Sequence, residues 1–176
     1  MWLFLASEVM FFTLLIGGFI NMKGRSPAGA NHVLNIPITA VNTFILILSS
    51  TLVVMALASA QDGKMKRTLY LLLGTWVLGA PFLSIQLNEY ANMMRAGVTP
   101  SGSLFGSGFY ALTGFHGLHV LIGLGWLTGL IIMTMRGLVT SARSHVIEIF
   151  GLFWHFVDVV WIVLFTIVTR LQLLDF

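Results

Sequence analysis

Cysteine is absent from this chain of 176 residues, and charged residues make up only 9% of it. Without cysteine there is no disulfide framework and no thiolate that could bind a metal. Soluble domains normally carry about 25% charged residues, so the scarcity of charge excludes an ordinary water-soluble fold. The net charge is +3, but no stretch groups basic with aromatic residues as a nucleic-acid surface requires. Nucleic acid is therefore not an expected partner.

Hydrophobic residues are abundant, at 57% of the sequence with a mean hydropathy of +0.95. They form five runs, each near the roughly 20 residues that cross a hydrocarbon core, at about 2–21, 37–60, 68–90, 104–135 and 145–170. The apolar run begins at Trp2 without a basic segment before it, and no small-residue cleavage site is visible, so a cleavable signal peptide is not expected. These features predict an all-α, polytopic membrane protein, with a single domain over 1–176 that forms a bundle of five transmembrane helices.

The segments between the runs predict loops and a topology. Loops are expected at 22–36, 61–67, 91–103 and 136–144, and Pro81 should kink the third helix. The loops at 61–67 and 136–144 lie on one side of the membrane and hold five basic residues. The other side holds four basic residues: Lys23, Arg25, Arg95 and Arg170. If positive residues stay inside, the N-terminus is cytoplasmic and the C-terminus faces outside.

The last run, HVIEIFGLFWHFVDVVWIVLFTIVTR, carries polar residues on one side. Glu148, Gly151, His155 and Asp158 follow one another at intervals of 3, 4 and 3, so they share one helical face. Ionisable groups are costly inside a membrane. We therefore expect this face to turn inward toward protein, a lipid headgroup or water, and the spacing of His155 and Asp158 allows a local pair.

Three more ionisable residues lie within hydrophobic runs: Glu8 in LASEVMFF, and His116 and His119 in GFHGLHV. Glu8 is either a proton-linked or lipid-contacting site, or a carboxyl that hydrogen-bonds a neighbouring helix. The two histidines could share a metal with His155, Glu148 and Asp158, or make hydrogen bonds between helices. No Glu stands three residues before a His, so the repeated Glu-x-x-His pattern of a di-metal site is absent.

Small residues mark places where helices could approach closely. These are Ser49, Ser50, Gly114, Gly117, Gly125 and Gly129. On the residues alone, two functions of other classes stay open. One is a stand-alone membrane metalloenzyme that uses His116, His119 and His155. The other is a small proton-coupled transporter that uses Glu8 and Asp158.

Several longer segments resemble one known family. They are SEVMFF at 7–12, PITAVNTFILILSS at 37–50, QLNEY at 86–90, GSGFYALTGFHGLHVLIG at 106–123 and HVIEIFGLFWHFVDVVWI at 145–162. Together they touch all five runs and resemble subunit III of the heme–copper terminal oxidases, which include cytochrome c and quinol oxidases. Longer members of that family have seven helices, and this chain resembles the last five.

The resemblance implies a non-catalytic subunit of a proton-pumping oxidase in aerobic respiratory electron transport. Such a subunit carries no heme, copper or other metal, because the hemes and copper belong to partner subunits. It packs mainly on subunit I, with subunit II and a small subunit IV as further expected partners. It binds phospholipid and supports proton uptake and turnover stability. The implied location is the bacterial plasma (inner) membrane, with multiple spans.

The resemblance also extends to single residues. Glu8 falls on the buried carboxyl that carbodiimide reagents modify in mitochondrial-type members. The intramembrane polar positions of the family correspond here to Glu8, His116, His119, Glu148, His155 and Asp158. These residues are expected to form a hydrogen-bonded core and lipid-headgroup contacts, with no catalytic, cofactor-binding or metal-binding role.

Overall fold

The computed structural model describes residues 1–23, 36–95, 99 and 104–173, and these contain helices and no strand. The elements in order are α1 (Trp2–Lys23), α2 (Ile36–Gln61), α3 (Met65–Arg95), α4 (Leu104–Met135), the short 3₁₀ helix η1 (Ser141–Arg143) and α5 (His145–Leu173). Each of the five α-helices is long and apolar enough to cross a membrane. The prediction of an all-α membrane protein with five spans is confirmed.

The five expected spans lie within the five helices, and the main difference is in α3. This helix begins at Met65 and ends at Arg95, and it continues through Pro81. The expected loop at 61–67 is therefore too long, because only residues 62–64 separate α2 from α3. The expected loop at 91–103 likewise starts too early. The remaining loop residues 24–35, 96–98 and 100–103, Arg25 among them, lie outside the described part of the chain.

Glycines in a left-handed conformation end two of the helices. Gly63, after α2, has a φ of 76°, and Gly137, after α4, has a φ of 69°. At the first turn the Gly63 N–H donates to the carbonyl of Ala60 at 3.0 Å, and the Lys64 N–H donates to Ser59 at 2.9 Å. This pair of bonds satisfies carbonyls that the end of a helix otherwise leaves free, and glycine adopts the required φ without strain.

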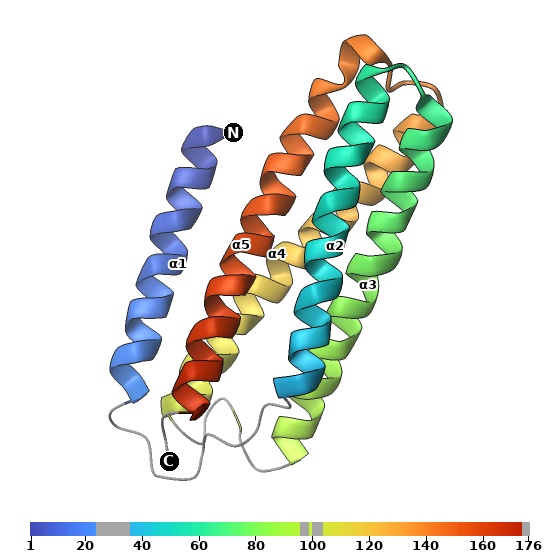
Figure 1. Cartoon of the computed structure of the whole chain (residues 1–176). Helices are drawn as coiled ribbons and strands as arrows, with labels where there is room; N and C mark the ends of the chain where they lie inside the picture. The colour runs from blue at the N-terminus through green and yellow to red at the C-terminus, as the bar shows by residue number, and fades with distance from the viewer. Residues whose placement is uncertain (24–35, 96–98, 100–103, 174–176) are drawn as a thin grey trace.

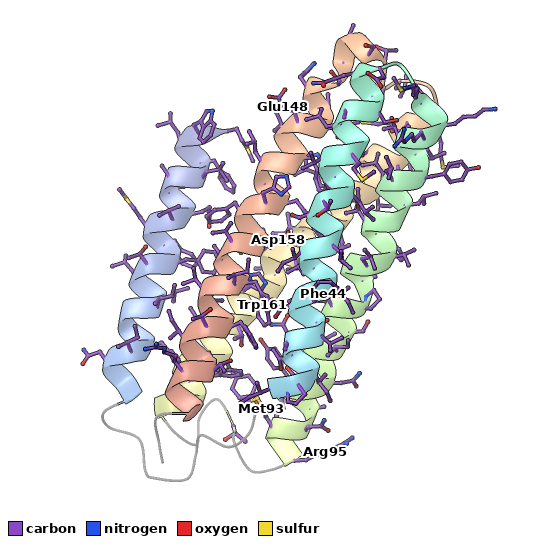
Figure 2. The ribbon with its side chains drawn as sticks, viewed as in Figure 1. Phe44, Met93, Arg95, Glu148, Asp158 and Trp161 are labelled. Carbon is purple, nitrogen blue, oxygen red and sulfur yellow. The ribbon has the colours of Figure 1, made fainter. Side chains whose placement is uncertain are left out.

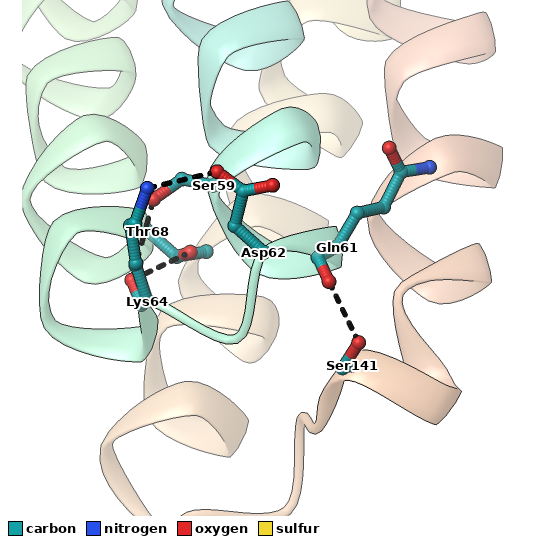
Figure 3. Close-up of polar contacts among 6 residues, drawn as sticks. All are labelled: Ser59, Gln61, Asp62, Lys64, Thr68 and Ser141. Atoms are coloured by element: carbon teal, nitrogen blue, oxygen red, sulfur yellow. Dashed lines mark hydrogen bonds and ion pairs between the residues drawn. The ribbon is translucent and has the colours of Figure 1, made fainter.

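Side chains reinforce the turn between α2 and α3 (Figure 3). The hydroxyls of Ser59 and Thr68 both donate to the carbonyl of Lys64, at 3.3 and 3.2 Å. Ser141 of η1 donates to the carbonyl of Gln61 at 2.8 Å. The α2–α3 turn and the segment before α5 are thereby joined at one end of the bundle, the same end as the start of α1 (Figure 1).

The helix α1 lies at the side of the other four helices (Figure 1). It packs mainly on α4 and makes a smaller contact with α5. Its buried hydrophobic residues are Leu5, Phe12 and Phe19, which recur every seven residues and so form one narrow stripe. Most of α1 outside this stripe is exposed, as expected for a surface that faces lipid or another protein.

The helix α2 is at the centre of the remaining four, between α3 and α5. Its buried positions recur at intervals of three and four and are mostly small or polar: Thr39, Asn42, Thr43, Leu46, Ser49, Val53, Ala56, Ser59 and Ala60. Small side chains let neighbouring backbones come close. Opposite Val53, α5 carries Gly151, where an added Cβ would lie 3.3 Å from a Val53 methyl carbon.

The largest fully buried side chain is Trp154 of α5. Its ring occupies space left by glycines on two other helices. An added Cβ at Gly123 of α4 would lie 2.6 Å from a ring carbon, and one at Gly79 of α3 would lie 3.1 Å away. The indole N–H donates to the hydroxyl of Ser49 on α2 at 3.0 Å. One tryptophan therefore brings α2, α3, α4 and α5 together.

The glycines singled out in the sequence behave differently. An added Cβ at Gly125, Gly129 or Gly114 would meet nothing within 4 Å, whereas one at Gly117 would meet Gln86 at 3.3 Å. The expectation of a close helix contact is therefore wrong for Gly114, Gly125 and Gly129 within the described part of this chain, and Gly117 agrees with it. Ser49 and Ser50 do lie at helix contacts, as expected. The Ser49 hydroxyl accepts a hydrogen bond from Trp154, and the Ser50 hydroxyl is hydrogen-bonded to Nδ1 of His155.

Candidate functional site

The carboxyl group of Glu8 on α1 meets His119 on α4. Nε2 of His119 lies 3.0 Å from Oε2 of Glu8, and the exposed fractions of the two side chains are 13% for His119 and 18% for Glu8. On the other side of the ring, Nδ1 lies 2.7 Å from the carbonyl oxygen of Phe115. Of the two sequence-based alternatives for Glu8, this geometry matches a carboxyl that hydrogen-bonds a neighbouring helix.

These two contacts determine where one proton lies. The Phe115 carbonyl can only accept, so Nδ1 must carry a hydrogen. Nε2 then either accepts from a protonated Glu8 or donates to an ionised Glu8. In both forms a single proton lies between the two side chains and the pair has no net charge. A pair without net charge is tolerated in a membrane far better than an isolated carboxylate.

Aromatic rings surround this pair. Phe12 of α1 meets the His119 ring edge-on with centroids 5.2 Å apart, and Phe153 of α5 stacks on it at 6.4 Å. Phe11 and Phe115 pack edge-to-face at 5.1 Å beside it. The polar contact between α1 and α4 is thus flanked by apolar rings and is mostly buried.

His116 lies one turn from His119 but has a different environment. It is fully buried, and neither ring nitrogen has a hydrogen-bond partner among the described residues. Its ring stacks on Trp161 at 4.8 Å and meets Phe82 edge-on at 5.9 Å. The hydrogen bond between helices that was expected for His116 is therefore absent from the described part, and its contacts are aromatic.

The polar face of α5 is only partly turned inward. Figure 2 shows Glu148, Asp158 and Trp161 in succession along this helix. Gly151 and Asp158 are buried, His155 is half-buried and Glu148 is exposed. Glu148 lies in the first turn of α5, where the expected partner can be a lipid headgroup or water instead of protein.

His155 and Asp158 do not form the local pair that their spacing allows. Nδ1 of His155 lies 2.8 Å from the hydroxyl of Ser50 on α2. Both carboxylate oxygens of Asp158 are buried and have no hydrogen-bond partner among the described residues. The polar contact of α5 at this level is therefore made across to α2 rather than along its own helix.

The three histidines proposed as metal ligands have separate neighbours. His116 packs on Trp161, His119 bonds Glu8, and His155 bonds Ser50. Within the described residues, no three His, Asp or Glu side chains come close enough to hold a metal ion. The geometry gives the stand-alone metalloenzyme no support.

A polar cluster that the sequence reading missed lies where α3 meets α4. Gln86 donates to the carbonyl of Thr113 at 2.9 Å and to the hydroxyl of Tyr90 at 3.1 Å. Tyr90 donates in turn to the Thr113 hydroxyl at 2.7 Å. Nearby, the Thr39 hydroxyl donates to Glu89 at 2.9 Å. This bond links Glu89 of α3 to α2.

A groove of about 350 Å³ runs along the outside of α3 and α4. Almost all of its walls are apolar, and it is lined by Leu83, Gln86, Leu87, Tyr90, Gly114, Gly117, Leu118 and Leu121. Gly114 and Gly117 line it on α4, and an added Cβ at Gly114 would meet nothing within 4 Å. The size and apolar character suit a hydrocarbon chain.

Comparison with known proteins gives a consistent match. The sequence matches the family Cytochrome c oxidase subunit III over residues 1–171. It is 35% identical to Quinol oxidase subunit 3 of Bacillus subtilis (strain 168) over 94% of this chain and 82% of that protein. It is 34% identical to Cytochrome bo(3) ubiquinol oxidase subunit 3 of Pseudomonas putida over 98% of this chain and 84% of that protein. It is 31% identical to Cytochrome c oxidase subunit 3 of Alkalihalophilus pseudofirmus, over 95% of this chain and 82% of that protein.

The family match spans α1 to α4 and nearly all of α5, so it includes every intramembrane polar group described above. The relatives are subunits of multi-subunit oxidases by their names. Five helices able to span a membrane agree with a subunit of that kind. The chain therefore belongs to the cytochrome c oxidase subunit III family, as a multi-pass membrane subunit of a heme–copper oxidase.

Proposed function

We propose that this chain is the non-catalytic subunit III of a proton-pumping terminal oxidase. As a single transmembrane domain, it packs mainly on subunit I, with subunit II and a small subunit IV as neighbours. It binds phospholipid and supports proton uptake and the turnover stability of the catalytic subunit. Electron transfer to oxygen takes place at the hemes and copper of the partner subunits. The intramembrane polar residues Glu8, His116, His119, Glu148, His155 and Asp158 serve structure and lipid contact.

The observation that carries the proposal is the bond between Glu8 and His119. It attaches α1, which otherwise packs on its neighbours by apolar contacts, to α4 at a point enclosed by aromatic rings. A bond of this kind maintains the shape of a supporting subunit. Besides the bond between Glu8 and His119, the hydrogen bond of the His119 ring among the described residues is to the Phe115 carbonyl, which cannot pass on a proton as a relay would need.

The groove along α3 and α4 supports the proposal of lipid binding. Its walls are apolar, and the polar cluster of Gln86 and Tyr90 lies at one end of it. An acyl chain laid in the groove would gain van der Waals contacts with its walls, which is the packing term that acts between apolar groups inside a membrane. We therefore place one acyl chain of a bound phospholipid in this groove.

For the topology we propose a cytoplasmic N-terminus in a bacterial inner membrane. The start of α1 lies at the same end of the bundle as the turns at 62–64 and 136–144 (Figure 1). Arg67, Arg136 and Arg143 lie at this end together with Lys64 and Lys66. Basic residues favour the cytoplasmic side.

The test of the proposed function is the variant Glu8→Ala in the intact oxidase. Loss of one bond in a supporting subunit should leave the initial rate of oxygen consumption nearly unchanged. It should also reduce the number of turnovers that the enzyme completes before it loses activity. A complex that is inactive from the first turnover, with all subunits and hemes present, would show that Glu8 has a direct part in the reaction and contradict the proposal.

A further inference from the structure

The helix α5 has an outer face that no other part of the described chain covers. Figure 1 shows α5 between α1 and α2, with α4 behind it. The residues at this face, called here the outer face of α5, recur at intervals of four and three: Glu148, Leu152, His155, Val159 and Ile162. Val159 is 58% exposed and Ile162 is 40% exposed. Glu148 lies in the first turn of α5, and beyond it the outer face is apolar, as lipid contact requires, except for one residue in its middle.

That exception is the ring of His155. Its Nδ1 is engaged by Ser50, but its Nε2 has no hydrogen-bond partner among the described residues. The side chain is only half-buried, so the ring reaches the surface of the seam between α5 and α2. Whichever nitrogen carries the hydrogen, the other polar atom of the ring requires a partner.

His155 lies near the middle of the membrane. It is ten residues from the start of α5, which corresponds to about 15 Å at a rise of about 1.5 Å per residue. Its partner Ser50 lies close to the middle of α2, which spans Ile36–Gln61. A hydrocarbon core is roughly 30 Å thick, so both residues are at a depth where neither water nor headgroups reach.

Acyl chains cannot satisfy a ring nitrogen at this depth, and an unpaired polar group there costs several kcal/mol. The neighbouring elements of this chain do not supply a partner either. The contacts of α1 with α5 are made by rings, Phe4 with Phe153 and Phe12 with Phe156. The Asp158 carboxylate is buried and makes no hydrogen bond to His155.

We propose that the outer face of α5 is covered by a transmembrane helix of another oxidase subunit, which places a hydrogen-bonding side chain opposite Nε2 of His155. Asn, Gln, Ser and Thr are the side chains that make such bonds between membrane helices. The inference rests on the proposed function, since it requires that the chain is assembled in an oxidase. It adds the surface and the residue through which one neighbour is recognised.

Photo-crosslinking in the purified, active complex tests the contact directly. Benzoylphenylalanine is placed at Val159 or Ile162, and at Val77 on α3 as a control of similar exposure (59%). Both positions on α5 should give adducts with the same transmembrane segment of one other subunit, identified by mass spectrometry. Val77 should not give an adduct with that segment. Adducts with lipid alone, or with a second copy of this chain, would overturn the inference.

Two variants test the role of the ring. His155→Phe should increase dissociation of the neighbouring subunit in detergent by about 3- to 18-fold, the range that corresponds to one hydrogen bond between membrane helices. Like His155→Phe, Ser50→Ala removes the hydrogen bond between Ser50 and Nδ1 of His155. It leaves Nε2 of His155 in place, so the neighbouring subunit should be retained. Equal loss in both variants would mean that His155 only holds α2 and α5 together, and would overturn the inference.

The outcomes separate this inference from the proposed function. Lipid adducts alone, in a complex that still contains this chain, would overturn the docking surface and leave the supporting role intact. A chain that purifies free of every oxidase subunit would overturn both.

Discussion

Trp161 of α5 donates its indole N–H to Oγ1 of Thr43 on α2 at 2.9 Å, and the Thr43 hydroxyl donates to the carbonyl of Thr39 at 2.8 Å. Both side chains are buried. The bond joins two helices at a depth where no water can replace it. It also orients the Trp161 ring against which His116 stacks. The position of the buried histidine therefore depends on a threonine of a third helix.

Thr43→Ala should destabilise the subunit, because the indole N–H of Trp161 then lacks a partner. We expect a loss of about 0.6–1.7 kcal/mol in the free energy of unfolding, the range for hydrogen bonds between membrane helices. Unfolding in mixed micelles measures it. Thr51→Ala is the control, since Thr51 is exposed and its hydroxyl bonds only its own helix. Equal losses in the two variants would contradict the role of the Trp161 bond.

Gly123→Ala should destabilise the bundle, because the new Cβ would lie 2.6 Å from the ring of Trp154. Overpacking of a filled core costs about 1–3 kcal/mol. Gly125→Ala, two residues along the same helix, adds a Cβ that meets nothing within 4 Å, so it should be neutral or slightly stabilising. The melting temperatures of the two variants in detergent make the comparison. A Gly123→Ala variant as stable as the parent would show that Trp154 can shift without cost.

Glu8→Gln should preserve most of the stability that Glu8→Ala loses. The amide of Gln can donate to a neutral Nε2 of His119, so the link between α1 and α4 remains although no carboxyl is present. The number of turnovers before inactivation should be close to the parent value for Gln and clearly lower for Ala. If both variants lose activity at the same rate, then the proton between Glu8 and His119, rather than the bond, is what matters.

Gly114→Leu should reduce the amount of phospholipid that the subunit retains. The added side chain would extend into the groove between α3 and α4, where at present nothing lies within 4 Å of the position of its Cβ. Phospholipid per complex, measured after delipidating washes, is the readout. Gly125→Leu, also on an open part of α4 but outside the lining of the groove, is the matched control. Unchanged lipid content in Gly114→Leu would place the bound lipid elsewhere.

Hydropathy alone predicted the number of helices and nearly all of their bounds, because a run of about 20 apolar residues has few other stable structures in a membrane. The end of α3 was misjudged because the hydrophobic run that predicted this helix stops at residue 90. In the structure residues 91–95, which include the polar Asn92 and Arg95, add a further turn and a half of helix. At the membrane surface a polar composition does not end a helix.

The partners of the polar residues could not be predicted in the same way. Glu8 and His119 are 111 residues apart in sequence, and nothing in either segment identifies the other. The small residues of α2 at intervals of three and four were a usable signal for its contact face, although only Ser49 and Ser50 were singled out. Gly79 and Gly123, which both leave space for the Trp154 ring, are 44 residues apart in sequence. Their shared role is visible only after the helices are packed.

Glu8 and His119 are separated by 111 residues in sequence, which has a consequence for the synthesis of the chain on the ribosome. At about 5–20 residues per second, the ribosome needs roughly 6–22 s after Glu8 to reach His119. During that interval Glu8 has no histidine to bond. The carboxyl group on α1, which is costly alone in a membrane, must therefore be accommodated by other groups until α4 is in place.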